Sequence, residues 1–179
     1  MLPALRLAQP IERQDRAMPE PTSDQWPAGP AQPDAARQPV TEPLSEAECL
    51  RLLSPGGIGR IGYLGRTGPA VLPVNFKLHQ GAIVFRTERD SPLGEDLRTG
   101  IAHAYYKVAF EVDEIDQAAR EGWSVLIQGD AHHVDAPDEQ AELARAGVNP
   151  WPGGKKELFL RIVPTRITGR RIAHPRPGG

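Results

Sequence analysis

The 179-residue sequence has a single cysteine, Cys49, and no long apolar run. One cysteine cannot form a disulfide within the chain and fits the reducing cytosol, so we expect a cytoplasmic protein. A membrane-spanning helix needs about 18 or more consecutive apolar residues, and because the sequence offers no such run we expect no membrane span. The net charge of −2 provides no overall field that would draw the chain to nucleic acid or to an anionic membrane.

The sequence also lacks the motifs of metal sites and of hydrolases. Of its five histidines, His132 and His133 are adjacent in a predicted strand, so their side chains point to opposite faces and do not easily share a metal. No Cys, His or Asp spacing matches a zinc or iron site, so we expect no metal. No G-x-S-x-G motif is present, and nothing predicts hydrolysis.

Residues 57–62 match the pattern G-x-G-x-x-G, but their context does not fit a dinucleotide-binding motif. Such a motif follows a strand, opens a helix and is followed by an acidic residue about 20 positions on. Here the pattern follows the end of a predicted helix, and no acidic residue occurs before Glu88. We therefore predict a strand at this position.

The N-terminal part of the chain is expected to be a disordered, proline-rich tail over residues 1–43. Eight of the 19 prolines lie between Met1 and Glu42, among Ala, Gln, Asp and Glu. This composition buries too little apolar surface to offset the loss of chain entropy on folding. The predicted folded domain covers residues 44–172, and residues 173–179 are expected to be a flexible C-terminus.

Two or three short helices are predicted. Ser45 and Glu48 have the spacing of a capping box, so a helix is expected to begin there and to end at Pro55. Cys49 lies on the apolar face of this helix and is interpreted as a small core residue. Ser91 can cap a second short helix beginning at Pro92. A third helix is predicted over residues 137–146.

The most informative stretch is a predicted hairpin, formed by Val71–Lys77, a tight turn and Ala82–Thr87. Because side chains alternate along a strand, one face of each strand is apolar and the other polar. The polar side would suit a ligand that is part flat ring and part phosphate. Further strands are predicted near residues 57–64, 107–113, 123–129 and 158–168. Several short strands separated by turns favour a mainly β protein with a small closed barrel.

Six stretches occur in this order in the sequence: Val71–Phe76, Ile83–Thr87, Ser91, Val108–Asp113, Gly122–Val125 and Ile167–Arg171. Together they resemble the pyridoxamine 5′-phosphate oxidase-like, FMN-binding split-barrel family, and more narrowly its flavin/deazaflavin oxidoreductase-type branch. The resemblance covers about residues 44 to 172. It implies a six-stranded split β-barrel that forms a homodimer, with FMN bound at the interface and hydride or electrons passed to an unidentified small molecule.

The resemblance also implies a set of cofactor-binding residues. Pro73, Val74, Asn75 and Phe76 would run beside the isoalloxazine ring. Phe85, Arg86, Thr87 and Ser91 would hold the ring edge, the ribityl chain and the phosphate. Trp123 and Ser124 would come from a neighbouring strand or from the other subunit, and Trp151 is a candidate to close the site.

Two positions depart from the pattern of this family. Relatives commonly have a lysine directly after the loop serine, where this chain has Pro92, so that a phosphate-neutralising charge is lost unless Lys77 or Arg89 replaces it. The arginine-rich end that closes over pyridoxal phosphate in true pyridoxamine phosphate oxidases is not reproduced by residues 167–172. The vitamin B6 reaction is therefore not predicted, and no catalytic side chain is named.

Three alternatives remain open from the sequence. The same barrel could bind the deazaflavin F420 or haem as a reductase, or it could be a non-catalytic flavin-binding module. The third alternative is a nucleic-acid-binding barrel, because seven basic residues and one acidic residue, Glu157, lie between Lys155 and Arg176. Such a barrel would need exposed aromatic side chains among the basic ones. Only Trp151 and Phe159 are candidates, and a solvated edge is favoured.

Overall fold

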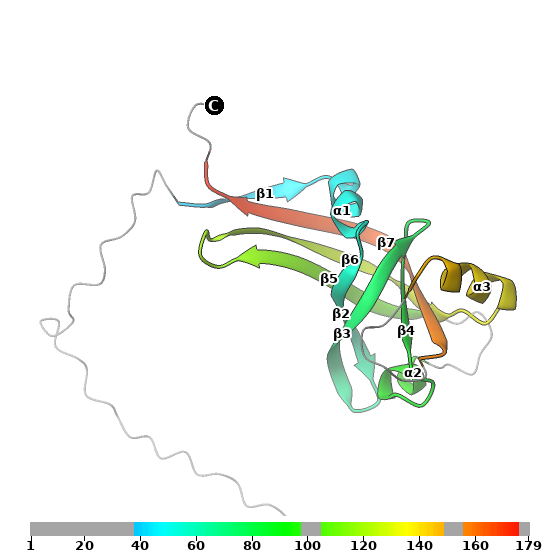
Figure 1. Cartoon of the computed structure of the whole chain (residues 1–179). Helices are drawn as coiled ribbons and strands as arrows, with labels where there is room; N and C mark the ends of the chain where they lie inside the picture. The colour runs from blue at the N-terminus through cyan, green and yellow to red at the C-terminus, as the bar shows by residue number, and fades with distance from the viewer. Residues whose placement is uncertain (1–37, 98–104, 149–155, 176–179) are drawn as a thin grey trace, which may run out of the picture. The chain divides into compact units, whose positions relative to one another are not determined.

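The computed structural model describes residues 38–97, 105–148 and 156–175, which form antiparallel strands with three short helices (Figure 1). No helix in these ranges is long and apolar enough to cross a membrane. The strands are β1 (Val40–Leu44), β2 (Gly57–Gly65), β3 (Gly68–His79), β4 (Ala82–Thr87), β5 (Tyr106–Asp116), β6 (Glu121–His133) and β7 (Leu158–Ala173). The helices are α1 (Glu46–Leu53), α2 (Pro92–Asp96) and α3 (Pro137–Arg145).

Six of the strands close into a ring. The order β4-β3-β2-β5-β6 is antiparallel throughout, and β7 pairs with both β6 and β4, which closes the barrel. The prediction of a mainly β, six-stranded split barrel with two or three short helices is therefore confirmed. The seventh strand, β1, was not expected. Residues Val40–Leu44 of β1 pair with the C-terminal end of β7. All of them except Leu44 fall in the range 1–43, which was expected to be a disordered tail.

β1 has no sequence pattern that would reveal it. Its residues are exposed apart from Leu44, which is half-buried, and it includes Pro43. It is held by backbone pairing with Gly169–Ala173 rather than by burying an apolar face. Pattern-based prediction detects a strand from its alternating apolar residues, and this strand has none.

β7 is a 16-residue strand that belongs to two parts of the sheet. Leu158–Ile162 pair with β4, whereas Gly169–Ala173 pair with β1, and β6 runs along the other edge of both parts. The register with β6 shifts after Gln128, so that Thr165 is an extra residue in β7. This β-bulge marks the point where the barrel continues into a sheet extension of β5, β6, β7 and β1 (Figure 1).

The first helix begins as predicted. The Ser45 hydroxyl accepts the Glu48 N–H, and the Glu48 carboxylate accepts the Ser45 N–H at 2.9 Å, which completes the capping box. The Ser45 hydroxyl also donates to the Glu48 carboxylate at 2.7 Å, and this bond, together with that from the Ser45 N–H, lowers the pKa of Glu48. Cys49 is fully buried beside Gly169 of β7, and burial raises the pKa of its thiol. The interpretation of Cys49 as a core residue is confirmed.

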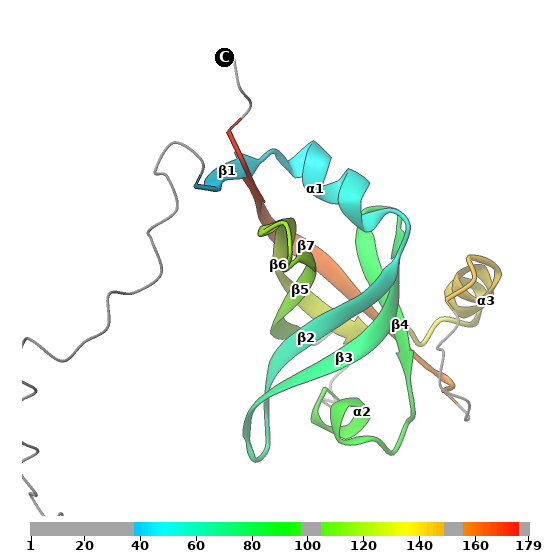
Figure 2. The same cartoon turned by 60° about the vertical axis from the view of Figure 1, so that its left-hand side comes forward.

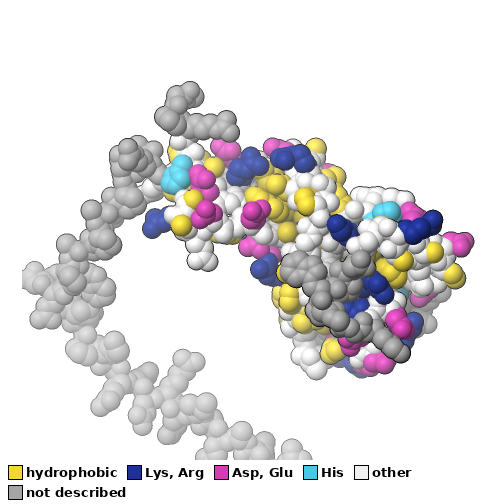
Figure 3. Space-filling view, viewed as in Figure 1, with side chains coloured by type: hydrophobic (Ala, Val, Ile, Leu, Met, Phe, Trp, Pro, Cys, Tyr) yellow, Lys and Arg dark blue, Asp and Glu magenta, His cyan; other side chains and the backbone are white. Residues whose placement is uncertain are grey.

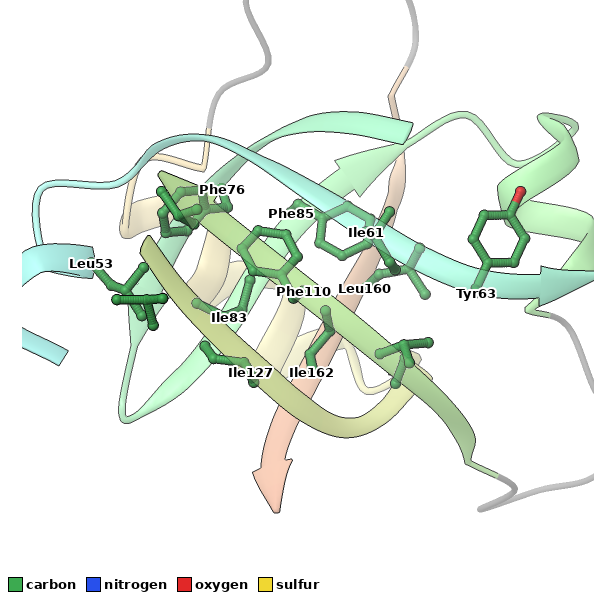
Figure 4. Close-up of a cluster of buried hydrophobic side chains, with 14 of the residues drawn as sticks. Leu53, Ile61, Tyr63, Phe76, Ile83, Phe85, Phe110, Ile127, Leu160 and Ile162 are labelled. Atoms are coloured by element: carbon green, nitrogen blue, oxygen red, sulfur yellow. The ribbon is translucent and has the colours of Figure 1, made fainter. Parts of the chain in front are cut away.

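The core lies inside the barrel and is dominated by aromatic and branched side chains (Figure 4). The Phe76 and Phe110 rings meet edge to face, with their centres 5.2 Å apart, and Phe85 is fully buried beside them. Phe76 and Phe85 were expected to contact a cofactor. Their side chains point into the barrel instead, because the period-two alternation of β3 and β4 assigns them to the inner face.

Gly59 makes room for the Phe110 ring, and this gives a test of the packing. A Cβ at Gly59 would lie 2.2 Å and 2.6 Å from two carbon atoms of that ring. We expect Gly59→Ala to lower the free energy of unfolding by about 1–3 kcal/mol, because overpacking forces the ring out of its place.

The control is Gly62→Ala on the same strand, where the nearest atom lies 3.8 Å from the added Cβ. Urea unfolding of both variants checks the prediction. Equal stability of the two variants would contradict it.

Candidate functional site

The barrel opens between β3 and β4. These strands pair only from Phe76–Phe85 to His79–Ala82, and beyond Phe76 they diverge. Figure 2 shows the two strands separating below their common turn, with α2 near their far ends. Leu93 and Leu97 of the α2 segment are buried in the barrel core. The helix therefore closes the core where the strands part.

A hollow of about 200 Å³ lies at this opening, and we call it the split hollow. Among the described residues that line it, none is a carboxylate and two are cations. These two cations would attract an anionic ligand. The lining residues are Leu72, Pro73, Val74, Asn75, Arg86, Thr87, Ser91, Pro92, Leu93 and Lys156.

Arg86 is the cation that β4 places in the split hollow. Its backbone is paired opposite Phe159 of β7, and its guanidinium carbon lies 4.9 Å from the centre of the Phe159 ring. This cation–π contact holds the planar group in place. The Nε–H of Arg86 is buried and has no hydrogen-bond partner among the described residues. A buried unpaired donor costs about 1–3 kcal/mol, so a ligand oxygen here would relieve that cost.

Thr87 and Ser91 lie beside Arg86 and are joined by a hydrogen bond of 2.9 Å between their hydroxyls. The Ser91 hydroxyl also accepts the Gly94 N–H at 3.0 Å, which caps α2, and it lies 2.7 Å from the Glu88 carbonyl. Two hydroxyls carry two protons. When Ser91 donates to Glu88 and Thr87 to Ser91, neither proton is left for a ligand. When Ser91 donates to Thr87, the Thr87 proton becomes available to an anion.

Lys156 was missed by the sequence analysis. Lys77 and Arg89 were considered as replacements for the charge absent at Pro92, but neither lines the split hollow. The Lys77 amino group donates to the Pro55 carbonyl at 3.2 Å and lines a different hollow. Lys156 precedes β7 and reaches the split hollow from a part of the chain 64 residues beyond Pro92. The excess of basic residues after Lys155 was the available signal, and it was interpreted as a solvated edge.

The structure therefore brings together six of the eleven expected site residues: Pro73, Val74, Asn75, Arg86, Thr87 and Ser91. The side chains of Phe76 and Phe85 lie in the core, as described above. Ser124 lines a second hollow of about 540 Å³ on the sheet extension, which we call the sheet hollow, and Trp123 lines a third near the tip of the β5–β6 hairpin. Neither shares a lining residue with the split hollow. Trp151 lies outside the described residues.

Two carboxylates line the sheet hollow, Glu111 and Asp113, and Arg60 of β2 contacts them at 3.1 Å and 2.5 Å. Arg170, which also lines this hollow, donates to the Ser124 hydroxyl at 3.3 Å. Burial raises the pKa of Glu111, and the charge of Asp113 acts in the same direction, whereas Arg60 opposes both. Figure 3 shows acidic side chains gathered at the left end of the described part, near the hairpin tip.

The described residues give little support to the nucleic-acid alternative. Phe159, one of its two candidate aromatic residues, is only 5% exposed and lies beneath Arg86. A base could not stack on it without displacing the guanidinium. Within the described ranges, no group of three or more His, Cys, Asp and Glu side chains has the geometry to hold a metal ion.

The family model for pyridoxamine 5′-phosphate oxidase matches residues 45–171. The chain belongs to the pyridoxamine 5′-phosphate oxidase family. This confirms the resemblance inferred from the hairpin and the strands that follow it. The split hollow lies inside the matched range and is formed mainly by those same stretches, namely Leu72–Asn75 and Arg86–Ser91.

The chain is similar in sequence or fold to proteins from several bacteria. An uncharacterized protein of Mycobacterium tuberculosis is 33% identical over 142 residues, which cover 79% of this chain and 91% of that protein. The structure of the FAD-binding protein from Mycobacterium smegmatis has a TM-score of 0.60 and 33% identity, covering 73% of this chain and 98% of that one. An FAD-binding protein from Mesorhizobium loti shares the fold, with a TM-score of 0.58 and 20% identity. The match covers 75% of this chain and 98% of that one.

The hydrogen bonds of Ser91 predict a stabilising role that does not depend on any ligand. Ser91→Ala removes the side-chain acceptor of the Gly94 N–H and the hydroxyl partner of Thr87. We expect it to lower the free energy of unfolding by about 1 kcal/mol, the usual cost of losing a helix N-cap. Urea unfolding checks this prediction.

Ser54→Ala is the matched control, because the exposed Ser54 hydroxyl donates only to the Arg51 carbonyl at the end of α1. A loss in Ser91→Ala no larger than that in Ser54→Ala would show that the cap of α2 does not stabilise the fold.

Proposed function

We propose that this chain is a flavin-binding oxidoreductase whose split hollow holds the phosphate of a flavin nucleotide, and that it acts as a homodimer with the flavin between the subunits. The observation that carries the proposal is that Arg86, whose buried Nε–H has no partner among the described residues, lines one hollow with Lys156, and that the described lining of this hollow includes no carboxylate. Two relatives with this fold are named as FAD-binding proteins, which agrees with such a ligand.

The residues of the split hollow fit the phosphate end of the flavin. A guanidinium group binds phosphate through two parallel N–H donors, and the Arg86 side chain is already held in place by Phe159. Lys156 would add a second positive charge, and Thr87 one hydroxyl proton. Arg86 and Thr87 both belong to β4, so the strand holds these two groups in place when the anion enters. FMN is the smallest flavin nucleotide that meets these requirements, and the deazaflavin F420 is the alternative.

The edge of β3 next to the split hollow suits the flavin ring. No strand pairs with β3 on this side between Leu72 and Val74, because β4 has turned away. The backbone groups there can face the polar edge of a ring, with Pro73 and Val74 giving apolar contact. A bound flavin would itself supply hydride or electron transfer, and the protein orients it and excludes water. The acceptor is proposed to be a small molecule.

A homodimer would bring the expected contacts together. Within one subunit, Ser124 and Arg86 line different hollows, and a flavin between two copies could meet Arg86 of one and Ser124 of the other. The outer face of the sheet, from β3 across to β7, carries the exposed apolar side chains of Ile58, Val71 and Leu126. An exposed apolar face of this kind is typical of an interface, and we propose a second copy as its partner.

The first test is spectroscopic. The purified protein, or the protein after addition of FMN or FAD, is expected to absorb at about 450 nm. Arg86→Met should weaken FMN binding by about tenfold or more and leave riboflavin binding nearly unchanged, because riboflavin lacks the phosphate. Lys156→Met should also weaken FMN binding and leave riboflavin binding nearly unchanged. Fluorescence titration measures both.

Arg145→Met is the control, since this exposed arginine of α3 lies outside the split hollow. A colourless protein that binds none of these flavins would overturn the proposal. Equal losses of FMN and riboflavin affinity in Arg86→Met would remove the phosphate assignment.

The second test asks whether two copies form each site. Arg86→Glu and Ser124→Trp are made on separately tagged chains, and the heterodimer is isolated by sequential affinity steps. Each variant homodimer should bind almost no flavin. The heterodimer should bind about one flavin per two chains, because one of its two sites combines an intact Arg86 with an intact Ser124.

If each subunit had a complete site of its own, both sites of the heterodimer would be damaged and it would bind no flavin. Melting temperatures of the two variants, compared with the unaltered protein, verify that they are folded. A protein that remains monomeric at working concentration would also contradict the proposal.

A further inference from the structure

Helix α3 lies on the outside of the barrel, beside β4 (Figures 1 and 2). Its Leu143 is fully buried and belongs to a group of five buried side chains that is separate from the barrel core, and we call this group the α3 cluster. None of the five lines the split hollow. The other members come from β4, from β7 and from the two segments that flank the helix: Val84, Phe159, Val134 and Val148.

The α3 cluster lies on the same face of β4 and β7 as the side chain of Arg86. Ile83 and Phe85 point into the barrel core, so Val84 and Arg86 point outward. Phe159 pairs opposite Arg86, and the centre of its ring lies 4.9 Å from the guanidinium carbon. Phe159 is therefore a member of the α3 cluster and also the support of the Arg86 side chain.

Hydrogen bonds connect α3 to the backbone and to the neighbour of Phe159. The Val134 N–H donates to the Phe159 carbonyl at 3.0 Å, and the Gln140 side chain of α3 donates to the Val134 carbonyl at 2.7 Å. Arg161, two residues along β7, donates to the Glu139 carboxylate of α3 at 2.7 Å. The position of Phe159 in the wall of the barrel is thus tied to the helix by polar and apolar contacts.

The support of Arg86 matters for an anion in the split hollow. An arginine side chain has many rotamers, and fixing one of them when a ligand binds costs free energy. A guanidinium group that is already held in place before the ligand arrives avoids much of this cost, so the anion binds more tightly. The contacts that keep the Phe159 ring in place therefore contribute to the affinity of a site that they do not touch.

We propose that α3 positions Arg86 for the flavin phosphate through Phe159, so that Phe159 and Leu143 are positioning residues of the split hollow. This inference rests on the proposed function, in which Arg86 binds that phosphate. Coupling between two sites is reciprocal. A phosphate bound at Arg86 therefore stabilises the packing of α3 on the barrel in return.

The first test uses Leu143→Ala, which removes the buried side chain of α3, and Phe159→Leu, which keeps an apolar residue but removes the ring. Each variant should bind FMN about fivefold more weakly, because the guanidinium loses its support. Riboflavin lacks the phosphate, so its affinity should stay within about twofold. Fluorescence titration measures both ligands.

The same two substitutions are then made together with Arg86→Met. Without the guanidinium group they should change FMN affinity by no more than about twofold, because they act through Arg86 and residues in one chain of contacts are not additive. A merely structural role predicts a different result. General loosening of the fold would weaken FMN and riboflavin alike, whether or not Arg86 is present.

Leu53→Ala is the matched control, because Leu53 of α1 is also fully buried on a short helix but belongs to the barrel core. It should leave both flavin affinities within about twofold. Melting temperatures verify that the variants are folded. Phe159→Leu keeps the proposal testable if Leu143→Ala folds poorly.

Hydrogen exchange tests the coupling in the other direction. Saturation of the unaltered protein with FMN should slow exchange of the α3 backbone amides about fivefold, the same factor by which α3 favours FMN. Riboflavin should have no such effect, since it has no phosphate for Arg86.

The outcomes separate this inference from the proposed function. If both variants bind FMN as well as the unaltered protein, if they weaken it equally without Arg86, or if FMN leaves exchange in α3 unchanged, then α3 does not position Arg86 and the flavin proposal stands. If the unaltered protein binds no flavin, the proposed function fails and this inference fails with it.

Discussion

The short ladder between β3 and β4 determines what this molecule offers to a ligand. Four residue pairs join the strands, and the ladder ends where Phe76 and Phe85 turn inward to pack near Phe110. Beyond that point, Leu93 and Leu97 close the core in place of a continued sheet. The opening is therefore sealed against the core but accessible from outside. Arg86 and Thr87, the next residues of β4, are held at its rim by the same strand that anchors the core.

The placement of cations around this opening follows from packing as much as from charge. Arg86 is fixed because Phe159 of the neighbouring strand supports its guanidinium group. Lys156 arrives from the segment that leads into β7, so two parts of the chain far apart in sequence supply the positive side of the hollow. The third cation, Lys77, lies on the outer face of β3 and faces a separate space. The distribution of charge thus extends along the face of β3 instead of being concentrated at one point.

The parts of the structure that could be predicted are those encoded by local patterns. The capping box at Ser45, the β3–β4 hairpin and the start of α2 each depend on a few neighbouring residues. The family resemblance rested partly on the hairpin and on Ser91 at the start of α2. β1 could not be predicted, because it is held mainly by backbone pairing and only Leu44 of its residues packs against the core. Lys156 could not be assigned either, since its place depends on how β7 returns to β4. Strand alternation predicts that the side chains of Phe76 and Phe85 point inward. They were nevertheless assigned to cofactor binding, because the family resemblance implied that role.

The extra residue Thr165 in β7 has a consequence for the whole second half of the strand. Before it, Leu160 and Ile162 face the interior, and after it Ile167 and Gly169 do, so even-numbered positions give way to odd-numbered ones. Removing Thr165 alone would make Pro164 and Arg166 neighbours opposite Gly129 and Gln128, so the ladder would become regular and Ile167 and Gly169 would still face inward. Removing a second residue from this stretch would shift the register by one and exchange the two sides of the strand, bringing Arg170 inward and Ile167 out to solvent. The bulge therefore absorbs one position without changing which side chains the barrel and its sheet extension bury.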